Sequence, residues 1–440
     1  MTVTLICNSD SRGGAAVVSL RLTKALRRRG IDARLLVAHS SSGLPYVEEA
    51  APAWRVKLPF YAECAQIALH NGMRRSLLFE ASTGAYGLPL SRHPWVEGAD
   101  AVILNWVNQG LLSISEIARI KAPVYWVMHD MWNATGLCHH AGLCDRYKAA
   151  CGSCPLLHGH SPLLPWPDMD APGKPDLSTK VVEAKERLYA AKPIRFVAVS
   201  NWLAGVCEQS RAMRGISPVV IPNAFPVDDY QSTPLRSRRQ CDLPEGRLIV
   251  MAAARLDTPV KGLPYAVEAL NKAYDAGAQA TAVFIGDLRD ESALAGLRMP
   301  RVMLGRLSAE RMADVYAHAD VVLSSSIYEN LPGTLIEGMA VGCVPVTFGQ
   351  GGQADIVDHL RTGYIARFPD TDDLARGLRW ALDTRLDRTA QHAEMARRFA
   401  ADTIASRWQS LLMENGYPAA NPVGFSTRCV ENLVAPINGQ

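Results

Sequence analysis

The segment from Glu329 to Glu337 has the residue types and spacing of a site for a sugar and an anion. It follows the apolar run 321–323, and a helix should open near Gly333, so the unpaired N–H groups of Gly333 and Thr334 would point beyond the strand end. We place Glu337 in the first helical turn and Glu329 in the loop before it, where both carboxylates can accept hydrogen bonds from sugar hydroxyls. The alternative is structural: Glu337 complements the helix dipole and Glu329 is solvated.

Arg255 and Lys261 form a second cluster, between the apolar run 248–251 and a helix expected from Leu263. At the carboxyl end of a strand, an arginine fork and a lysine point charge can neutralise a diphosphate without a metal ion. Solvated arginine and lysine side chains are common in surface loops, so a purely structural role is the alternative.

Four more candidates follow predicted strands of the first half of the chain. Gly13 and Gly14 lack the three-glycine spacing of the dinucleotide fingerprint, which argues against a nicotinamide or flavin cofactor. They still permit close approach of the backbone to a phosphate or a sugar. His129 is placed to hydrogen-bond a substrate, and Asn223 lies in a turn; for both, a structural role is the alternative.

Cys138, Cys144, Cys151 and Cys154 form a C-x5-C-x6-C-x2-C pattern. Four thiolates around a structural zinc ion would tie down an irregular insertion at about 130–176 that has little core of its own. Buried thiols, or a disulfide formed on oxidation, are the alternatives.

These candidates need elements that bring them together, and the chain supplies an α/β pattern. Short apolar runs alternate with amphipathic stretches, which predicts parallel sheets with helices on both faces. We expect two Rossmann-like β/α/β domains facing each other across a deep cleft, a preferred place for a ligand. The strand candidates are 3–7, 33–37, 101–104, 124–127, 196–199, 218–221, 248–251, 282–285, 302–304, 321–323 and 344–346. The predicted boundaries are a first domain 1–225, a proline-rich linker 226–246, a second domain 247–400, and a helix and tail 401–440 that crosses back.

Composition excludes several classes of protein. Apolar residues make up 48% and charged residues 20% of the 440 residues, which excludes disorder and fibrous repeats, and a net charge of +3 does not point to nucleic acid. No apolar run is long enough for a membrane helix, and the first residues show no export signal, so we expect a cytoplasmic protein. The segment 58–90 is either an interfacial helix, giving peripheral contact with the inner membrane, or a helix that covers the core.

Together these segments resemble the retaining glycosyltransferases of family 4, which have the GT-B architecture. The stretch 126–140 resembles a branch associated with exopolysaccharide assembly, of the colanic acid type, although Asn105 stands where that branch commonly has histidine. The residues that carry the family resemblance are Glu329-x7-Glu337, Met339-Ala340-x-Gly342-x-Val344-Pro345-Val346, Ala319-Asp320, Arg255-Leu256, Lys261-Gly262, Gly351-Gly352, Ile356-Val357, Thr362-Gly363-Tyr364, Gly13-Gly14 and His129.

The resemblance implies a role for each candidate. Arg255 and Lys261 would hold the donor diphosphate, Glu337 the ribose hydroxyls, and Glu329 the donor sugar. His129 would act at the reacting centre, on the acceptor side. Further donor contacts would come from Gly14, Arg306, Asn330, Leu331, Gly333 and Thr334, and acceptor contacts from Gly13 and Asn223.

The implied reaction is transfer of a hexose from a UDP- or GDP-sugar, with retention, to a polysaccharide or lipid-linked oligosaccharide, with no cofactor required for catalysis. One alternative is a GT-B-like sugar-nucleotide epimerase or hydrolase with the same donor contacts. A distant alternative is a zinc-dependent nucleic-acid-binding module built on the cysteine insertion and on Arg27–Arg29, which leaves Glu329 and Glu337 unexplained, so we expect no nucleic-acid partner.

Overall fold

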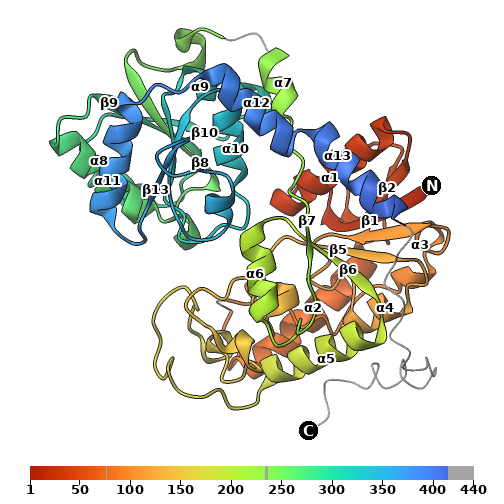
Figure 1. Cartoon of the computed structure of the whole chain (residues 1–440). Coiled ribbons are helices and arrows are strands. Elements are labelled where there is room, and N and C mark those ends of the chain that lie inside the picture. Colours follow the sequence, from red (N-terminus) through yellow and green to blue (C-terminus); the bar gives the residue numbers. More distant parts are fainter. Residues whose placement is uncertain (76, 233–235, 415–440) are drawn as a thin grey trace. The chain divides into compact units, whose positions relative to one another are not determined.

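The computed structural model describes residues 1–75, 77–232 and 236–414, and the chain divides into two compact units (Figure 1). The first unit holds Met1–Ile221 together with the chain from Ala405 onward, and the second holds Pro222–Ile404. The part of the predicted tail from 415 to 440 lies outside the described residues.

The first unit contains a parallel sheet of seven strands in the order β3-β2-β1-β4-β5-β6-β7. Strand β1 is an interior strand that pairs with β2 on one side and β4 on the other, so that Leu5 lies opposite both Leu35 and Ile103. All three side chains are fully buried, as expected for apolar strands covered on both faces. The strands are β1 (Thr2–Ser9), β2 (Asp32–His39), β3 (Val47–Glu49), β4 (Ala101–Leu104), β5 (Val124–Met128), β6 (Ile194–Ala198) and β7 (Val219–Val220).

Helices alternate with these strands, and the last helix of the described chain also packs on this sheet. The Trp408 ring lies against Tyr125 of β5, with ring centroids 6.2 Å apart, and Arg29 Nε donates to Gln409 Oε1 at 2.9 Å. The helices are α1 (Gly14–Arg28), α2 (Ala53–His70), α3 (Pro94–Glu97), α4 (Ile114–Arg119), α5 (Leu177–Ala191), α6 (Asn201–Gln209) and α13 (Ala401–Met413), of which the part from Ala405 belongs to this unit.

The region between β5 and α5 holds only short 3-10 helices, and its backbone is tied together by one arginine. Arg146 donates to the carbonyl oxygens of Ser153, Asp168 and Ala171. A side chain with five donors can thus satisfy carbonyls that no regular element would pair. The insertion ends at Asp176, whose carboxylate caps α5 by accepting from the Ser178 and Thr179 N–H groups.

The second unit contains a parallel sheet of six strands in the order β10-β9-β8-β11-β12-β13. Helices α8 and α11 pack together on one face, and α10 packs with α9 and α12 on the other. The strands are β8 (Arg247–Arg255), β9 (Ala280–Asp287), β10 (Arg301–Gly305), β11 (Val321–Ser324), β12 (Val344–Phe348) and β13 (Tyr364–Ala366). The helices are α7 (Val227–Ser232), α8 (Leu263–Asp275), α9 (Ala309–His318), α10 (Gly333–Ala340), α11 (Thr371–Asp383) and α12 (Arg388–Phe399).

The predicted linker 226–246 requires correction. The chain forms α7 at its start, and Val227, Tyr230 and Leu243 are buried in the core of the second unit with Phe399. The prolines suggested an extended connection, but the apolar residues between them pack against α12. The segment 58–90 is likewise not one helix, because α2 ends at His70.

Candidate functional site

The strand order places a topological switch point in each unit. In the second unit β8 has β9 on one side and β11 on the other, and in the first unit β1 lies between β2 and β4. Ligands of open α/β sheets bind outside the carboxyl ends of the strands at such points, because the loops on the two sides diverge there. We therefore expect ligands to bind at the loops that follow β8 and β11 in the second unit, and at those that follow β1 and β4 in the first.

In the second unit, the loop after β8 is joined to the loop after β11. Ser325 Oγ donates to the Lys261 carbonyl at 3.0 Å, and the Ile327 N–H donates to the Val260 carbonyl at 3.0 Å. The Lys261 ammonium forms an ion pair with the Glu329 carboxylate. Two of the residues that the sequence nominated are thus in direct contact, although they are 68 positions apart.

Two glycines make this closeness possible. Gly262 has φ +63° and a side chain there would collide with the Ser325 carbonyl; Gly351 has φ +96° and a side chain there would collide with the Glu329 carbonyl. The Gly352 N–H donates to the Glu329 carbonyl at 2.8 Å, so the loop after β12 joins the same cluster. Loops from three adjacent strands therefore hold Glu329 in place.

The other cation, Arg255, ends β8 and is held by its own loop. Its Nε donates to Thr258 Oγ1 at 3.0 Å and lies 3.5 Å from Asp257 Oδ1, and its side chain is 39% exposed. Arg255 thus lies at the same sheet end as Lys261. Arg306 follows β10, two strands away from β8, and pairs with Asp287, which lies opposite Arg255 in the pairing of β8 with β9.

Helix α10 begins at Gly333, as predicted, after Pro332. Asn330 is buried in the turn before it, and Leu331 and Thr334 are partly exposed. The placement of Glu337 in the first turn is wrong: the first turn contains no acid, and Glu337 is the fifth helical residue. The favourable interaction between a carboxylate and the N-terminal amides of a helix falls off within the first turn, so Glu337 in the second turn does not complement the helix dipole.

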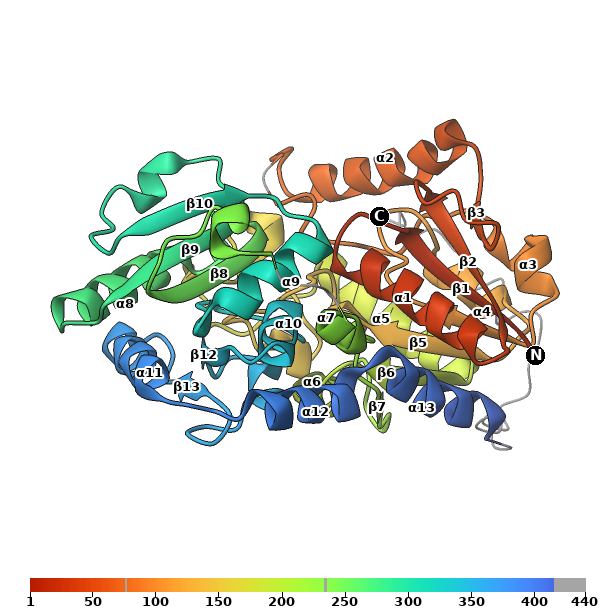
Figure 2. The ribbon, with the colours of Figure 1, turned by 90° about the horizontal axis from the view of Figure 1, so that it is seen from above.

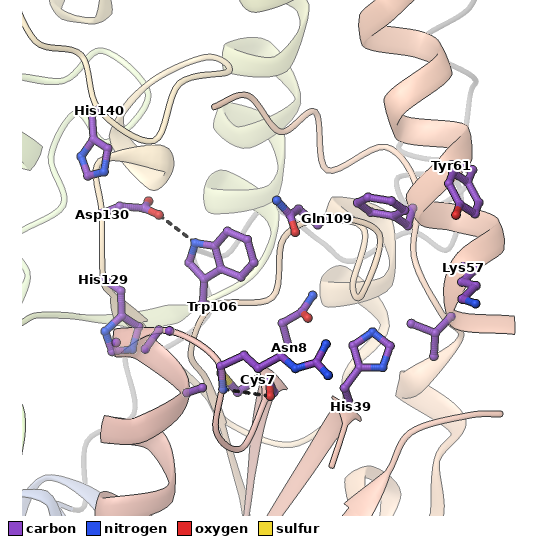
Figure 3. Close-up of a pocket in the computed structure, with 18 residues that line it drawn as sticks. Cys7, Asn8, His39, Lys57, Tyr61, Trp106, Gln109, His129, Asp130 and His140 are labelled. Atoms are coloured by element: carbon purple, nitrogen blue, oxygen red, sulfur yellow. Dashed lines mark hydrogen bonds between the residues drawn. The ribbon is translucent and has the colours of Figure 1, made fainter. Parts of the chain in front are cut away.

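In the first unit, a cavity of about 680 Å³ opens at the carboxyl ends of β1, β2, β4 and β5 (Figure 3). Gly13 and Gly14 line it from the start of α1, and His129 from the end of β5. Figure 3 shows Trp106 and Asp130 on one side and Lys57 and Tyr61, both on α2, on the other. The lining residues are Cys7, Asn8, Ser9, Arg12, Gly13, Gly14, Ala15, Ala16, His39, Val56, Lys57, Phe60, Tyr61, Trp106, Gln109, His129, Asp130 and His140.

The one carboxylate among the lining residues is already engaged. Asp130 Oδ2 accepts from Trp106 Nε1 at 2.9 Å and from His139 Nδ1 at 2.8 Å, and its Oδ1 accepts from the Trp132 N–H at 2.8 Å. Burial raises the pKa of Asp130, but His139 and these hydrogen bonds outweigh it and hold the pKa well below its ordinary value. Asp130 is therefore an ionised residue that fixes the Trp106 ring.

His129 is a neutral imidazole in this arrangement. Burial lowers its pKa to about 4, against an opposing effect of Asp130, and its Nε2 lies 3.0 Å from Asn105 Oδ1. Asn105, which departs from the pattern of the resembled branch, thus orients the histidine. Asn223 lies in the second unit, after β7, and does not line the cavity.

Several lining residues were not nominated from the sequence. Trp106 follows strand β4 by two positions, but an aromatic residue after a strand is not by itself a signal of a binding site. Lys57 and Tyr61 come from α2, which no strand end marks. Their place in the cavity lining follows only from the packing of α2 beside the sheet in the folded structure.

The four clustered cysteines line one small cavity of about 20 Å³, and all four are free thiols. The turn between the last two is tight: Cys151, Gly152 and Ser153 all have positive φ, a conformation that costs a non-glycine residue free energy. Within the described ranges, however, no three His, Cys, Asp or Glu side chains are grouped so that they could hold a metal ion. The zinc ion stays a prediction.

Part of the second unit resembles a known protein family. Residues 235–400 match the family Glycosyl transferases group 1. The chain is 29% identical to the 2-deoxystreptamine glucosyltransferase of Streptomyces kanamyceticus, over 37% of this chain and 45% of that enzyme. The chain thus spans about half the length of the first two curated relatives it matches, 45% and 54%.

Two longer matches extend the comparison. The D-inositol 3-phosphate glycosyltransferase of Rhodococcus erythropolis is 25% identical over 96% of this chain and 91% of its own. The structure of HepE from Anabaena, solved with UDP and glucose, matches with a TM-score of 0.60 at 17% identity, covering 94% of this chain and 99% of that one. The fold is therefore the predicted one, two Rossmann-like α/β domains of the GT-B type. The comparisons as a whole support a glycosyltransferase of group 1.

Proposed function

We propose that this protein transfers a hexose from a UDP- or GDP-sugar to a glycan or lipid-linked oligosaccharide, with retention of anomeric configuration, as a cytoplasmic enzyme of the exopolysaccharide-assembly type. The observation that carries the proposal is the ion pair of Lys261 with Glu329, at the same sheet end as Arg255 and at the switch point of the second unit. A neighbour solved with UDP and glucose supports a nucleotide-sugar donor.

The chemistry of the donor side follows from charge. When the bond between sugar and diphosphate breaks, negative charge develops on the diphosphate, and fixed positive groups stabilise it most where they are already oriented. Lys261 supplies a point charge, Arg255 a fork of donors, and the first amides of α10 supply N–H dipoles. Without donor, Glu329 keeps the Lys261 ammonium in position; with donor bound, we assign the Glu329 carboxylate to the hydroxyls of the sugar.

The acceptor side is the cavity of the first unit. Aromatic faces from Trp106 and Tyr61 suit the apolar faces of sugar rings, and the neutral imidazole of His129 suits a hydroxyl. Arg12 and Lys57 supply two positive charges against the single carboxylate of Asp130 among the lining residues. We therefore expect the cavity to accept a sugar that carries an anionic group.

The experiment is a turnover screen of the full chain against UDP-, GDP- and ADP-sugars, with free sugar and transferred sugar measured separately. We expect transfer from a UDP- or GDP-sugar in the presence of a glycan acceptor, and an NMR spectrum of the product that shows the anomeric configuration of the donor. Free sugar as the main product, or an epimerised nucleotide sugar, would replace the transferase by the hydrolase or epimerase. Absence of all three reactions, together with absence of nucleotide binding, would refute the assignment.

A further inference from the structure

Helix α2 has apolar side chains on both of its faces. Its buried face holds Val56 and Ile67 together with Glu63 and Gln66, and the Glu63 carboxylate accepts from the Thr83 N–H at 2.7 Å and the Gly84 N–H at 2.9 Å. Its outward face carries Trp54, Leu58, Tyr61 and Leu69, which are 62–73% exposed. A helix that only covers a core presents polar side chains to solvent, so the apolar outer face of α2 requires another explanation.

The exposed apolar residues form one continuous stripe. At 100° per residue, positions 54, 58, 61, 65 and 69 lie within one narrow sector of the helix surface. Met73 and Phe79, 69% and 62% exposed, continue the apolar surface beyond the end of the helix. Of the 13 large apolar side chains that are exposed in the described chain, these six lie between positions 54 and 79. Such concentration marks an interaction surface rather than scattered exposure.

The charges around the stripe have one sign. Arg55 and Lys57 flank it on either side, and Arg74 and Arg75 follow the helix; all four are exposed. Between positions 51 and 79 the only acid is Glu63, which faces inward. Arg74 also donates to the His158 carbonyl, which ties this end of the surface to the insertion.

We propose that this surface, formed by α2 and by residues 71–75 and 77–79, lies on an anionic phospholipid membrane. Tryptophan, tyrosine, arginine and lysine around an apolar stripe are the side chains that prefer the boundary between headgroups and acyl chains. A second copy of the chain fits less well, because a two-fold interface would bring the four cations of one copy against those of the other. Among the described helices, none is long and apolar enough to cross a membrane, so the contact is peripheral.

The surface also reaches the cavity of the first unit. Lys57 and Tyr61 belong to α2 and line the cavity, and Figure 2 shows α2 along the upper margin of the first unit with no labelled element beyond it. A membrane under α2 would hold the mouth of the cavity near the headgroups. If the proposed function is right, the acceptor is then lipid-linked; the membrane contact itself does not rest on that function.

The test is co-sedimentation of the full chain with phosphatidylcholine vesicles, with or without roughly a third of phosphatidylglycerol. We expect binding to the anionic vesicles at low salt, with partition reduced about tenfold or more by the triple change Trp54→Ser, Leu58→Ser and Leu69→Ser. Arg55→Glu with Arg75→Glu should reduce binding to anionic vesicles and make it insensitive to salt. None of these five residues lines the cavity.

The matched controls are Leu360→Ser, which removes a side chain 55% exposed in the second unit, and Arg28→Glu at the end of α1. Both should bind vesicles as the unchanged protein does. Circular dichroism and nucleotide binding establish that each variant is folded.

Binding without preference for anionic vesicles, or equal binding by the apolar triple variant, would overturn the proposal. The proposal would also be overturned if sedimentation velocity showed a dimer that the triple change dissociates, because the surface would then bind a second copy of the chain. A chain that binds vesicles but transfers no sugar would refute the proposed function alone.

Discussion

Replacing Lys261 by methionine separates a role in catalysis from a role in stability. The side chain keeps its length and loses its charge, so the ion pair with Glu329 disappears and the loops that join β8 and β11 keep their backbone hydrogen bonds. The Lys261 and Glu329 side chains are 29% and 19% exposed, so their pair is only partly withdrawn from water. Ion pairs in such settings contribute about 0–1 kcal/mol to the free energy of unfolding.

The expected effect on the reaction is much larger. Removal of one fixed donor from developing negative charge costs about 3–4 kcal/mol, or about 10²–10³ in kcat. A loss of stability of about 1 kcal/mol would lower Tm by only about 2–4 °C in a unit of this size. The expected loss of kcat is therefore large enough, and the expected shift in Tm small enough, to distinguish a role in catalysis from a role in stability.

The assay is steady-state transfer with the donor found in the screen, next to thermal unfolding of the same samples. The matched control is Lys272→Met on α8, which removes a lysine 32% exposed and paired with Glu268 and Asp372, away from the cluster. It should lose a similar amount of stability and no activity. A kcat for Lys261→Met within about fivefold of the unchanged enzyme, or an equal loss in Lys272→Met, would refute the reasoning.

Three further predictions follow from single residues. Gly262→Ala should lower Tm and donor affinity more than Gly277→Ala does, because both glycines have positive φ but only a side chain at 262 would collide with the Ser325 carbonyl; equal effects on melting and nucleotide titration would count against the packing of the two loops. The pKa of His129 is lowered to about 4 from an ordinary 6.5, so the unfolded chain binds the extra proton between these values, and stability should fall as pH drops from 6.5 towards 4. His129→Gln should flatten this part of the stability curve in urea titrations, and an unchanged slope would show that the imidazole is not held neutral. The zinc prediction rests on the cysteine spacing alone, and metal analysis of the purified protein tests it: one zinc ion per chain that Cys151→Ser removes and Cys64→Ser does not would confirm it, and a protein free of zinc and iron would end it.

Much of the fold could be predicted because parallel strands buried on both faces are continuous apolar runs. β4 was predicted to the residue, and α10 was placed at Gly333. The short strand β3, with an exposed Glu49, has no such run and was missed. The linker was mistaken because prolines are visible in a sequence, whereas burial of Val227 and Tyr230 between them is not.

The site could be predicted only where a residue follows a strand. Arg255, Lys261 and His129 satisfy that condition, because the carboxyl ends of parallel strands share one edge. The contact between Lys261 and Glu329 joins distant positions, and no local pattern encodes it. The sequence left open whether the segment 58–90 covers the core or lies at a membrane, because helical spacing alone does not show which side of α2 faces outward.

The central claim is that Arg255, Lys261 and the first amides of α10 hold a diphosphate, and one measurement tests it most directly. Calorimetric titration of the full chain compares the dissociation constant of the nucleoside diphosphate with that of its nucleoside, in the unchanged protein and in Lys261→Met. We expect the diphosphate to bind about 100-fold more tightly than the nucleoside, and this ratio to shrink about tenfold or more in the variant while nucleoside affinity stays the same. A ratio that is the same in both proteins would contradict the account.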